Sequence, residues 1–294
     1  MYDNLKMTKN LIDFAIFLTY AENEGNLQGG LTLKNYLKQK MKKGPVFGMT
    51  VCSGSPAVIE MMAMCGLDFA FIDTEHNPRS VGQCTELVLA CRAYGISPLL
   101  RVTRADEVEI RKALEIGSEG VIVPHIKTVE EMQTCVRGAK FPPIGRRGID
   151  IGVRSDCYGL ETYEGSDYRR YSNDTELVIP MAEDFEFIDN VEDLMSVPGI
   201  DAINFGPADL SNSIDKFNGY DMEKGYVAES LAKIRVQAEK RGIGIMAPAG
   251  VTAESAQKLI DKGVTMVLMS SDYNIWRETM VSIGKEINRL KGLK

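Results

Sequence analysis

The stretch FAFIDTEHNPRS, residues 69–80, decides how this chain folds. It begins as an apolar run typical of a buried strand and stops abruptly in Asp73, Thr74, Glu75 and His76. A buried strand that ends in titratable groups indicates a segment that lines the core and then reaches a functional site. The chain has only two histidines, and the second, His125, also follows an apolar run, VIVPH. One such histidine is more often structural, but two at strand ends favour a chemical role.

Short runs rich in β-forming residues alternate with amphipathic helical stretches on both sides of this segment. The predicted strands are residues 46–51, 68–73, 97–102, 120–126, 176–181, 202–206, 242–248 and 266–271. Each is almost continuously apolar, as expected of parallel strands that are buried on both faces. Eight strand–helix units predict an α/β fold, a (β/α)8 TIM barrel, with a doubly wound sheet as the alternative. No GxGxxG or Walker-type loop follows a strand, which favours the barrel.

The domain organisation follows from the same pattern. We predict an N-terminal helical extension at residues 1–30 and a single barrel domain at residues 31–294. The connection at residues 141–175 is unusually long and carries several arginines. Loops of this length are generally functional or make contacts.

Composition narrows the choice of partners and compartment. The formal net charge of −7 argues against nucleic acid as the main partner. The apolar run at residues 11–20 is too short to span a bilayer and contains Asp13, so no membrane association is expected. The six cysteines show no CxxC spacing and mostly lie in apolar stretches. They are interpreted as buried free thiols in a reducing compartment, which predicts a cytoplasmic protein.

Side chains that can take part in catalysis are concentrated at the predicted strand ends. In a (β/α)8 barrel, the active site is built from residues at the C-terminal ends of the strands. Those ends carry acidic, basic and imidazole groups, namely Asp73, Glu75, His76, Arg101, Arg104, His125, Glu183, Asp184, Asp209, Ser271 and Asp272. This convergence predicts an enzyme, against the alternative of a rim that is merely solvated.

Two of these carboxylates, Glu183 and Asp209, follow consecutive strands and have no cysteine nearby. Oxygen ligands with room for water suit a hard cation such as Mg²⁺ or Mn²⁺ better than zinc. The alternative is that both residues are helix N-caps, and FGPADLS fits a capped helix start. Such a start would also direct the amides near Ala208 and Asp209 at an anion. A Schiff-base mechanism needs a lysine, but no predicted strand contains one and only Lys127 lies just beyond a strand.

The motifs FIDTEHNPRS, LLRVTR, VPHIKTVEEM, PPIGRRG, MAED, IDNVEDL and GIDAINFGPADLS occur in this order, and with them the chain resembles the HpcH/HpaI aldolase family. The resemblance extends from about Leu33 to the C-terminus. It implies a barrel of the phosphoenolpyruvate/pyruvate type and a class II aldolase, a metal-dependent carbon–carbon lyase. Such an enzyme cleaves a 4-hydroxy-2-oxo acid to pyruvate and an aldehyde through a metal-stabilised pyruvate enolate, with Mg²⁺, Mn²⁺ or Co²⁺ as cofactor.

The resemblance also implies roles for single residues. The metal ligands would be Glu183 and Asp209, and the amides of Ala208 and Asp209 would bind the pyruvate carboxylate. One departure from the family pattern is Met181, where many members have Gln.

The implied catalytic residues are Asp73, His76 and Arg101. Arg101 would bind the enolate and thereby the substrate, and His76, held by Asp73, would remove the proton of the 4-hydroxyl group. Two alternatives stay open at this point: an acyl-CoA lyase of the citrate-lyase β type, and a catalytically silent barrel that acts as a scaffold.

The C-terminal stretch NIWRETMVSIGKEINRLKG, residues 274–292, is amphipathic. Its large apolar residues recur at steps of three and four and lie on one helix face: Trp276, Met280, Ile283, Ile287 and Leu290. The resemblance implies that this helix is exchanged between subunits of a homo-oligomer in which dimers assemble into hexamers.

Overall fold

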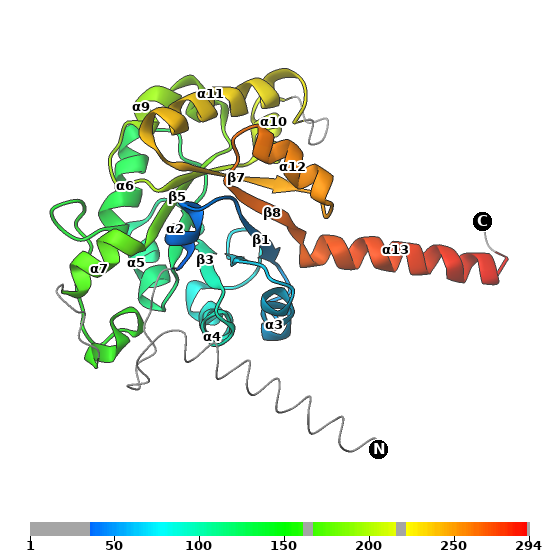
Figure 1. Ribbon diagram of the computed structural model, residues 1–294, viewed down its shortest axis with the longest axis horizontal. Helices are drawn as coiled ribbons and strands as arrows, with labels where there is room; N and C mark the ends of the chain where they lie inside the picture. Colours follow the sequence, from blue (N-terminus) through cyan, green and yellow to red (C-terminus); the bar gives the residue numbers. More distant parts are fainter. Residues whose placement is uncertain (1–35, 161–166, 216–221, 293–294) are drawn as a thin grey trace, which may run out of the picture. The chain divides into compact units, whose positions relative to one another are not determined.

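The computed structural model describes residues 36–160, 167–215 and 222–292. The chain divides into the units Met1–Thr32 and Leu33–Lys294, and the predicted extension at residues 1–30 lies outside the described residues. The second unit contains a closed barrel in which eight parallel strands follow one another in sequence order (Figure 1). The (β/α)8 prediction is therefore confirmed, and the doubly wound alternative is wrong.

The strands of the barrel are β1 (Val46–Val51), β2 (Phe69–Asp73), β3 (Ser97–Arg101), β4 (Gly120–Val123), β5 (Leu177–Ala182), β6 (Ala202–Phe205), β7 (Gly244–Ala249) and β8 (Met266–Ser271). The helices are α2 (Tyr36–Met41), α3 (Pro56–Met64), α4 (Thr85–Tyr94), α5 (Glu107–Glu115), α6 (Val129–Ala139), α7 (Tyr168–Thr175), α8 (Phe185–Asp189), α9 (Val191–Met195), α10 (Pro207–Ser213), α11 (Gly225–Arg241), α12 (Ala253–Asp261) and α13 (Asp272–Leu290). Two short 3₁₀ helices complete the fold, η1 (Val81–Cys84) and η2 (Arg154–Gly159). No helix in the described part of the chain is both long and apolar enough to cross a bilayer.

Two predicted strands differ from the observed ones by more than one residue at an end. The fourth was predicted to reach residue 126, but β4 ends at Val123 because the chain turns at His125, which has a positive φ of 54°. The seventh was predicted to begin at residue 242. Gly242 is instead the left-handed cap of α11, with φ 65°, and β7 begins two residues later. The interpretation of the cysteines as buried thiols holds for Cys84, Cys91 and Cys135 and needs correction for the others, since Cys52 and Cys157 are half-buried and Cys65 is exposed.

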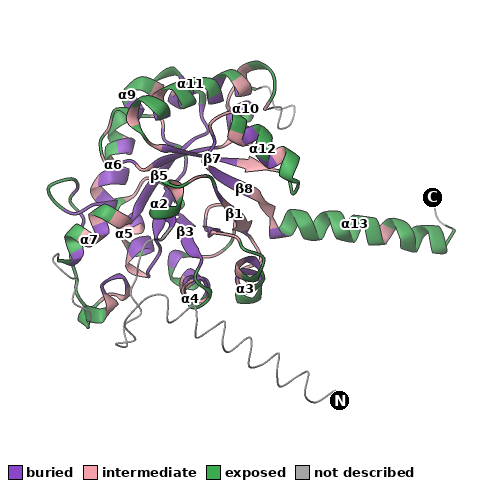
Figure 2. Cartoon of the chain, in the orientation of Figure 1, coloured by how far each residue is buried: buried purple, intermediate pink, exposed green. Residues whose placement is uncertain are grey.

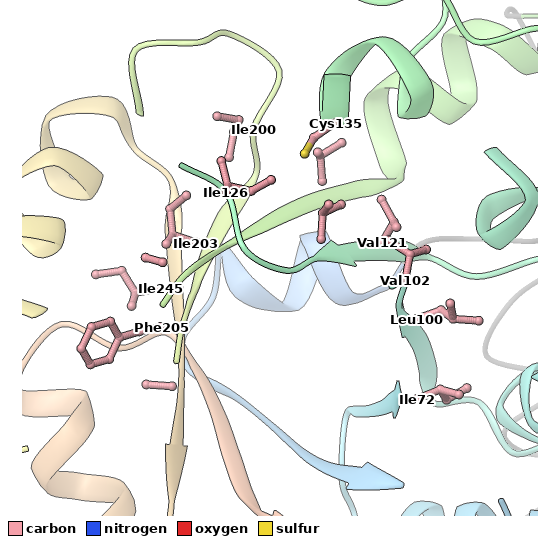
Figure 3. Packing of buried hydrophobic residues seen from close by; sticks show 14 of the residues in the cluster. Ile72, Leu100, Val102, Val121, Ile126, Cys135, Ile200, Ile203, Phe205 and Ile245 are labelled. Carbon is pink, nitrogen blue, oxygen red and sulfur yellow. The ribbon is translucent and has the colours of Figure 1, made fainter. Parts of the chain in front are cut away.

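Alternation along each strand separates two layers of core. In β2, Phe69 and Phe71 belong to the cluster inside the barrel, whereas Ala70 and Ile72 belong to the outer cluster. Figure 3 shows part of this outer cluster, including Ile72, with its side chains on the outer side of the strands. Because the side-chain period of a strand is two, a residue two positions beyond an interior residue also points into the barrel. Asp73 therefore follows Phe71 into the barrel mouth.

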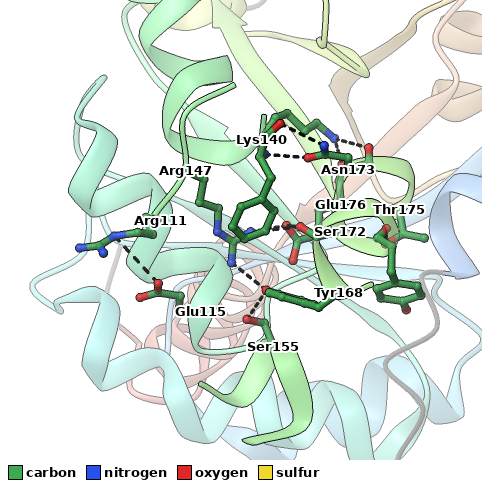
Figure 4. A network of polar contacts seen from close by, with 12 residues as sticks. Arg111, Glu115, Lys140, Arg147, Ser155, Tyr168, Ser172, Asn173, Thr175 and Glu176 are labelled. Atoms are coloured by element: carbon green, nitrogen blue, oxygen red, sulfur yellow. Dashed lines mark hydrogen bonds and ion pairs between the residues drawn. The ribbon is translucent and has the colours of Figure 1, made fainter. Parts of the chain in front are cut away.

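The long connection at residues 141–175 is held together next to the start of β5 by a buried polar network (Figure 4). The Arg147 guanidinium donates to the Glu176 carboxylate at 2.5 Å and to the Tyr168 hydroxyl at 3.0 Å. It also lies over the Phe141 ring, 4.8 Å from the centroid. The Tyr168 hydroxyl donates in turn to Ser155. The segment expected to make contacts therefore makes them inside the chain, just before β5.

Replacing Arg147 with Gln should lower the free energy of unfolding by about 3 kcal/mol, because Glu176 would keep a buried charge without its partner. Urea denaturation monitored by circular dichroism measures this change. Arg146→Gln is the matched control, since Arg146 is the exposed neighbour and should change stability by less than about 0.5 kcal/mol. Equal stability of the two variants would contradict the anchoring role.

Candidate active site

Arg101 and Asp73 form the ion pair at the centre of the barrel mouth. They are register partners in β3 and β2, and the Arg101 Nε donates to Asp73 Oδ1 at 2.8 Å. The Nη1 atom lies 2.8 Å from Glu75 Oε2, and the guanidinium lies over the Phe71 ring. Burial would raise the pKa of Asp73, but the hydrogen bond and charge of Arg101 outweigh it and hold that pKa below its ordinary value. Arg101 is thus a fixed positive charge in the mouth.

Glu183, directly after β5, is the most deeply buried acid of the mouth, with 1 % of its surface exposed. Its Oε1 accepts a hydrogen bond from the His125 backbone N–H at 2.8 Å. Its Oε2 is buried and has no hydrogen-bond partner among the described residues. Burial raises the pKa of Glu183 to about 7, although the His125 N–H and ring charge oppose the shift. A buried carboxylate oxygen without a partner is costly unless a ligand contacts it.

Gly206, which follows β6, leaves room for this carboxylate. A Cβ atom at position 206 would lie 2.7 Å from Glu183 Oε2, closer than such atoms approach. Glycine is therefore required at this position by the close packing of Glu183.

The His125 side chain lies among three carboxylates. Its Nδ1 is 2.9 Å from Asp184 Oδ2 and its Nε2 is 3.2 Å from Glu75 Oε1. Burial alone would lower the pKa of His125, but the hydrogen bond to Asp184 and the charges of Glu183, Asp184 and Glu75 raise it above its ordinary value. Lys127 pairs with the other oxygen of Asp184 at 3.1 Å. This hydrogen bond raises the pKa of Lys127, the opposite of what a Schiff-base lysine needs.

Asp209 lies in the first turn of α10, and Gly206 is the N-cap of that helix. The alternative that Glu183 and Asp209 are N-caps is therefore wrong, because Asp184 occupies that position at α8. The first backbone hydrogen bond of α10 runs from the Leu210 N–H to the Gly206 carbonyl. The amides of Ala208 and Asp209 consequently have no partner within the helix. The predicted roles of Ala208 and Asp209 in binding pyruvate and metal stay predictions.

His76 lies at the rim, with 60 % of its side chain exposed. Its Nε2 is 3.8 Å from Glu75 Oε2. Asp73 instead accepts from Arg101, from the Glu75 backbone N–H at 3.0 Å and from Asn77 at 2.7 Å. Within the described ranges no hydrogen bond joins Asp73 to His76, so the expectation that Asp73 holds His76 needs correction. The reason is that Arg101, its register partner, occupies the carboxylate.

The structure adds Glu75 and His125 to the residues with a predicted role. Donor atoms of Glu75, His125 and Glu183 all lie within 4.8 Å of one another and form a group that could hold a metal ion. Both added residues stand in the strand-end set, and the sequence VPH was a signal for the second. Their convergence on Glu183 depends on the turn at His125, which the sequence does not specify.

The comparisons with known proteins point in one direction. A family model described as HpcH/HpaI aldolase/citrate lyase matches residues 47–278. The 2-keto-3-deoxy-L-rhamnonate aldolase of Escherichia coli K12 is 28 % identical over 275 residues, which cover 88 % of this chain and 98 % of that protein. The 2-dehydro-3,6-dideoxy-6-sulfogluconate aldolase of Pseudomonas putida is 30 % identical over 79 % of this chain and 88 % of its own length. A solved HpcH/HpaI aldolase structure from Desulfitobacterium hafniense DCB-2 has a TM-score of 0.79 at 26 % identity and covers 88 % of this chain and 98 % of its own.

Proposed function

Because this chain belongs to the HpcH/HpaI aldolase/citrate lyase family and is an enzyme of the aldolase type, we propose that it cleaves a 4-hydroxy-2-oxo acid to pyruvate and an aldehyde with the help of a divalent cation. The observation that carries this proposal is the buried Glu183 carboxylate, whose Oε2 has no hydrogen-bond partner in the described part of the chain. It lies at the same mouth as the fixed charge of Arg101. The names of both relatives denote 2-oxo acids as their substrates, which supports the substrate class.

The residues present fit a divalent metal ion. The Oε2 atom of Glu183, which is buried and has no hydrogen-bond partner among the described residues, provides a ligand for a cation. We propose Glu183 and Asp209 as its ligands, and carboxylate oxygens suit Mg²⁺, Mn²⁺ or Co²⁺. When bound, such an ion supplies Lewis-acid stabilisation of the charge that develops on the 2-oxo oxygen.

The remaining steps belong to residues of this chain. Arg101, fixed by Asp73 and Glu75, adds a positive charge beside the developing enolate, a contribution of about 3–4 kcal/mol for a preorganised donor. The unpaired amides of Ala208 and Asp209 at the start of α10 bind the substrate carboxylate. His76, accessible at the rim, removes the proton of the 4-hydroxyl group as the carbon–carbon bond breaks.

The proposed function is tested by incubating the full chain with 4-hydroxy-2-oxo acids and Mg²⁺, Mn²⁺ or Co²⁺ and measuring pyruvate release. We expect turnover that EDTA abolishes and that added metal restores. Condensation of pyruvate with a panel of aldehydes then identifies the aldehyde. Turnover that resists EDTA would refute the metal-dependent mechanism. Cleavage of only a CoA thioester would favour the acyl-CoA lyase, and binding of neither metal nor pyruvate would favour a scaffold.

The homo-oligomer is a separate proposal that rests on α13. Asp272 is the only buried residue of this helix, and Figure 2 shows α13 exposed along almost its whole length. The apolar residues of one face are 43–87 % exposed, namely Trp276, Met280, Ile283, Ile287 and Leu290. An apolar stripe of this length is rarely left in water by a monomer. We propose that it packs on a second copy of the chain.

Met280→Lys places a charge in the centre of this face and should convert the oligomer to inactive or aggregating monomers. Deletion of residues 274–294 should have the same effect. Glu278→Lys is the matched control, because Glu278 lies off the apolar face and the substitution should leave the assembly intact. Light scattering at micromolar concentration gives the molar mass. A monomeric wild-type protein would rule the proposal out.

A further inference from the structure

The site contains two donors, Glu75 and His125, that the proposed metal site of Glu183 and Asp209 does not use. Glu75, His125 and Glu183 follow three different strands, β2, β4 and β5, and their donor atoms converge within 4.8 Å. Of the three, Glu183 is almost completely buried and has one carboxylate oxygen without a partner among the described residues. A buried carboxylate oxygen without a partner, on a residue that belongs to this group of donors, indicates a missing ligand.

The two ring nitrogens of His125 have different partners. Its Nδ1 lies 2.9 Å from Asp184 Oδ2, and a carboxylate can only accept, so Nδ1 carries the proton. The Nε2 atom lies 3.2 Å from Glu75 Oε1, and in the metal-free site a proton between these two atoms accounts for the distance. Two acceptors this close need a proton or a cation that both can bind. Two ligands in adjacent positions on one metal, each with a bond of about 2.1 Å, lie about 3 Å apart.

The partners of this donor set are already arranged as a metal centre requires. A histidine ligand commonly donates its second N–H to a carboxylate, which fixes the ring orientation, and Asp184 accepts in this way from His125. Arg101 Nη1 lies at Glu75 Oε2, which leaves Glu75 Oε1 for another partner. Arg101 therefore orients one ligand as Asp184 orients the other.

The backbone of His125 is strained to make this arrangement. Its φ of 54° is in the left-handed region, which costs a non-glycine residue roughly 1 kcal/mol or more. The same turn directs the backbone N–H to Glu183 Oε1 and the ring toward Glu75. His125 thus positions Glu183 through its backbone N–H and contacts Glu75 through its ring. Backbone strain of this kind is typical of functional sites.

We infer that Glu75 Oε1 and His125 Nε2 join Glu183 as ligands of the divalent cation. The inference rests on the proposed function and deepens it, because it gives the cation a nitrogen ligand. Imidazole suits Zn²⁺, Co²⁺ and Ni²⁺, whereas a set of carboxylate and water ligands suits Mg²⁺ and Mn²⁺. The enzyme should accordingly bind Co²⁺ more tightly than Mg²⁺.

Pulsed EPR of the full chain loaded with Mn²⁺ tests the nitrogen ligand directly. The chain has only two histidines, so the variants His125→Asn and His76→Asn assign any signal without ambiguity. Asn suits position 125 because it adopts positive φ readily. We expect the nitrogen hyperfine coupling of a bound imidazole in the wild type and in His76→Asn, and its loss in His125→Asn.

Calorimetric titration with Mn²⁺ gives a second readout that does not depend on activity. The dissociation constant should rise at least tenfold in His125→Asn, since loss of an outer-shell partner alone costs about 10–100-fold. Glu75→Gln should also weaken binding and retain the nitrogen coupling. Mn²⁺ binding without imidazole coupling, or with coupling that persists in His125→Asn, would overturn this inference and leave the proposed function intact. Failure of the wild type to bind any divalent cation would overturn both.

Discussion

Glu183→Gln should abolish binding of the divalent cation and lower cleavage of a 4-hydroxy-2-oxo acid by about 10³-fold, the scale of several kcal/mol of lost Lewis-acid stabilisation. Glutamine has the same shape and can still accept from the His125 N–H through its carbonyl oxygen. It lacks the second carboxylate oxygen, which is buried and has no hydrogen-bond partner in the described ranges. Calorimetric metal titration and a pyruvate-release assay measure the two losses.

The stability of Glu183→Gln distinguishes the loss of a metal ligand from a general folding defect, because only a folding defect would lower the melting temperature. Burial raises the pKa of Glu183 to about 7, so the charged form is unfavourable in the metal-free protein above that pH. A neutral amide removes this penalty, and the melting temperature of the metal-free variant at pH 8 should be no lower than that of the wild type. Glu192→Gln on the exposed surface of α9 is the control. Full activity of Glu183→Gln in EDTA would refute the role of Glu183.

His76→Ala should lower kcat for cleavage by roughly 10²–10⁴, the usual effect of losing a general base. Affinity for pyruvate should change little, because Arg101 and the amides of α10 bind it in the proposed mechanism. The exposed position of His76 allows a sharper measurement, since exogenous imidazole can enter the vacated rim and should restore part of the rate. A variant with full cleavage and weakened pyruvate binding would make His76 a binding residue instead.

The strands and their order were predictable because the signals are local. A parallel strand buried on both faces is an apolar run, and the run can be recognised without knowing its neighbours. Strand β2 is the clearest example, and its period of two places Asp73 in the mouth. The strand ends were less predictable, as β4 shows, because Pro124 and Ile126 continue the apolar run after the ladder has stopped.

Local sequence thus determined the barrel and the presence of acids, Arg101 and two histidines at its C-terminal strand ends. Tertiary structure alone decided which of these groups meet. The His125 N–H binds Glu183, 58 positions along the chain, because the turn at His125 and the end of β5 come together only when the barrel closes. The register of β2 and β3 likewise pairs Asp73 with Arg101 instead of with His76. Hydrogen bonds between residues so far apart depend on atomic positions set by the whole barrel, and no periodic pattern in a single segment encodes them.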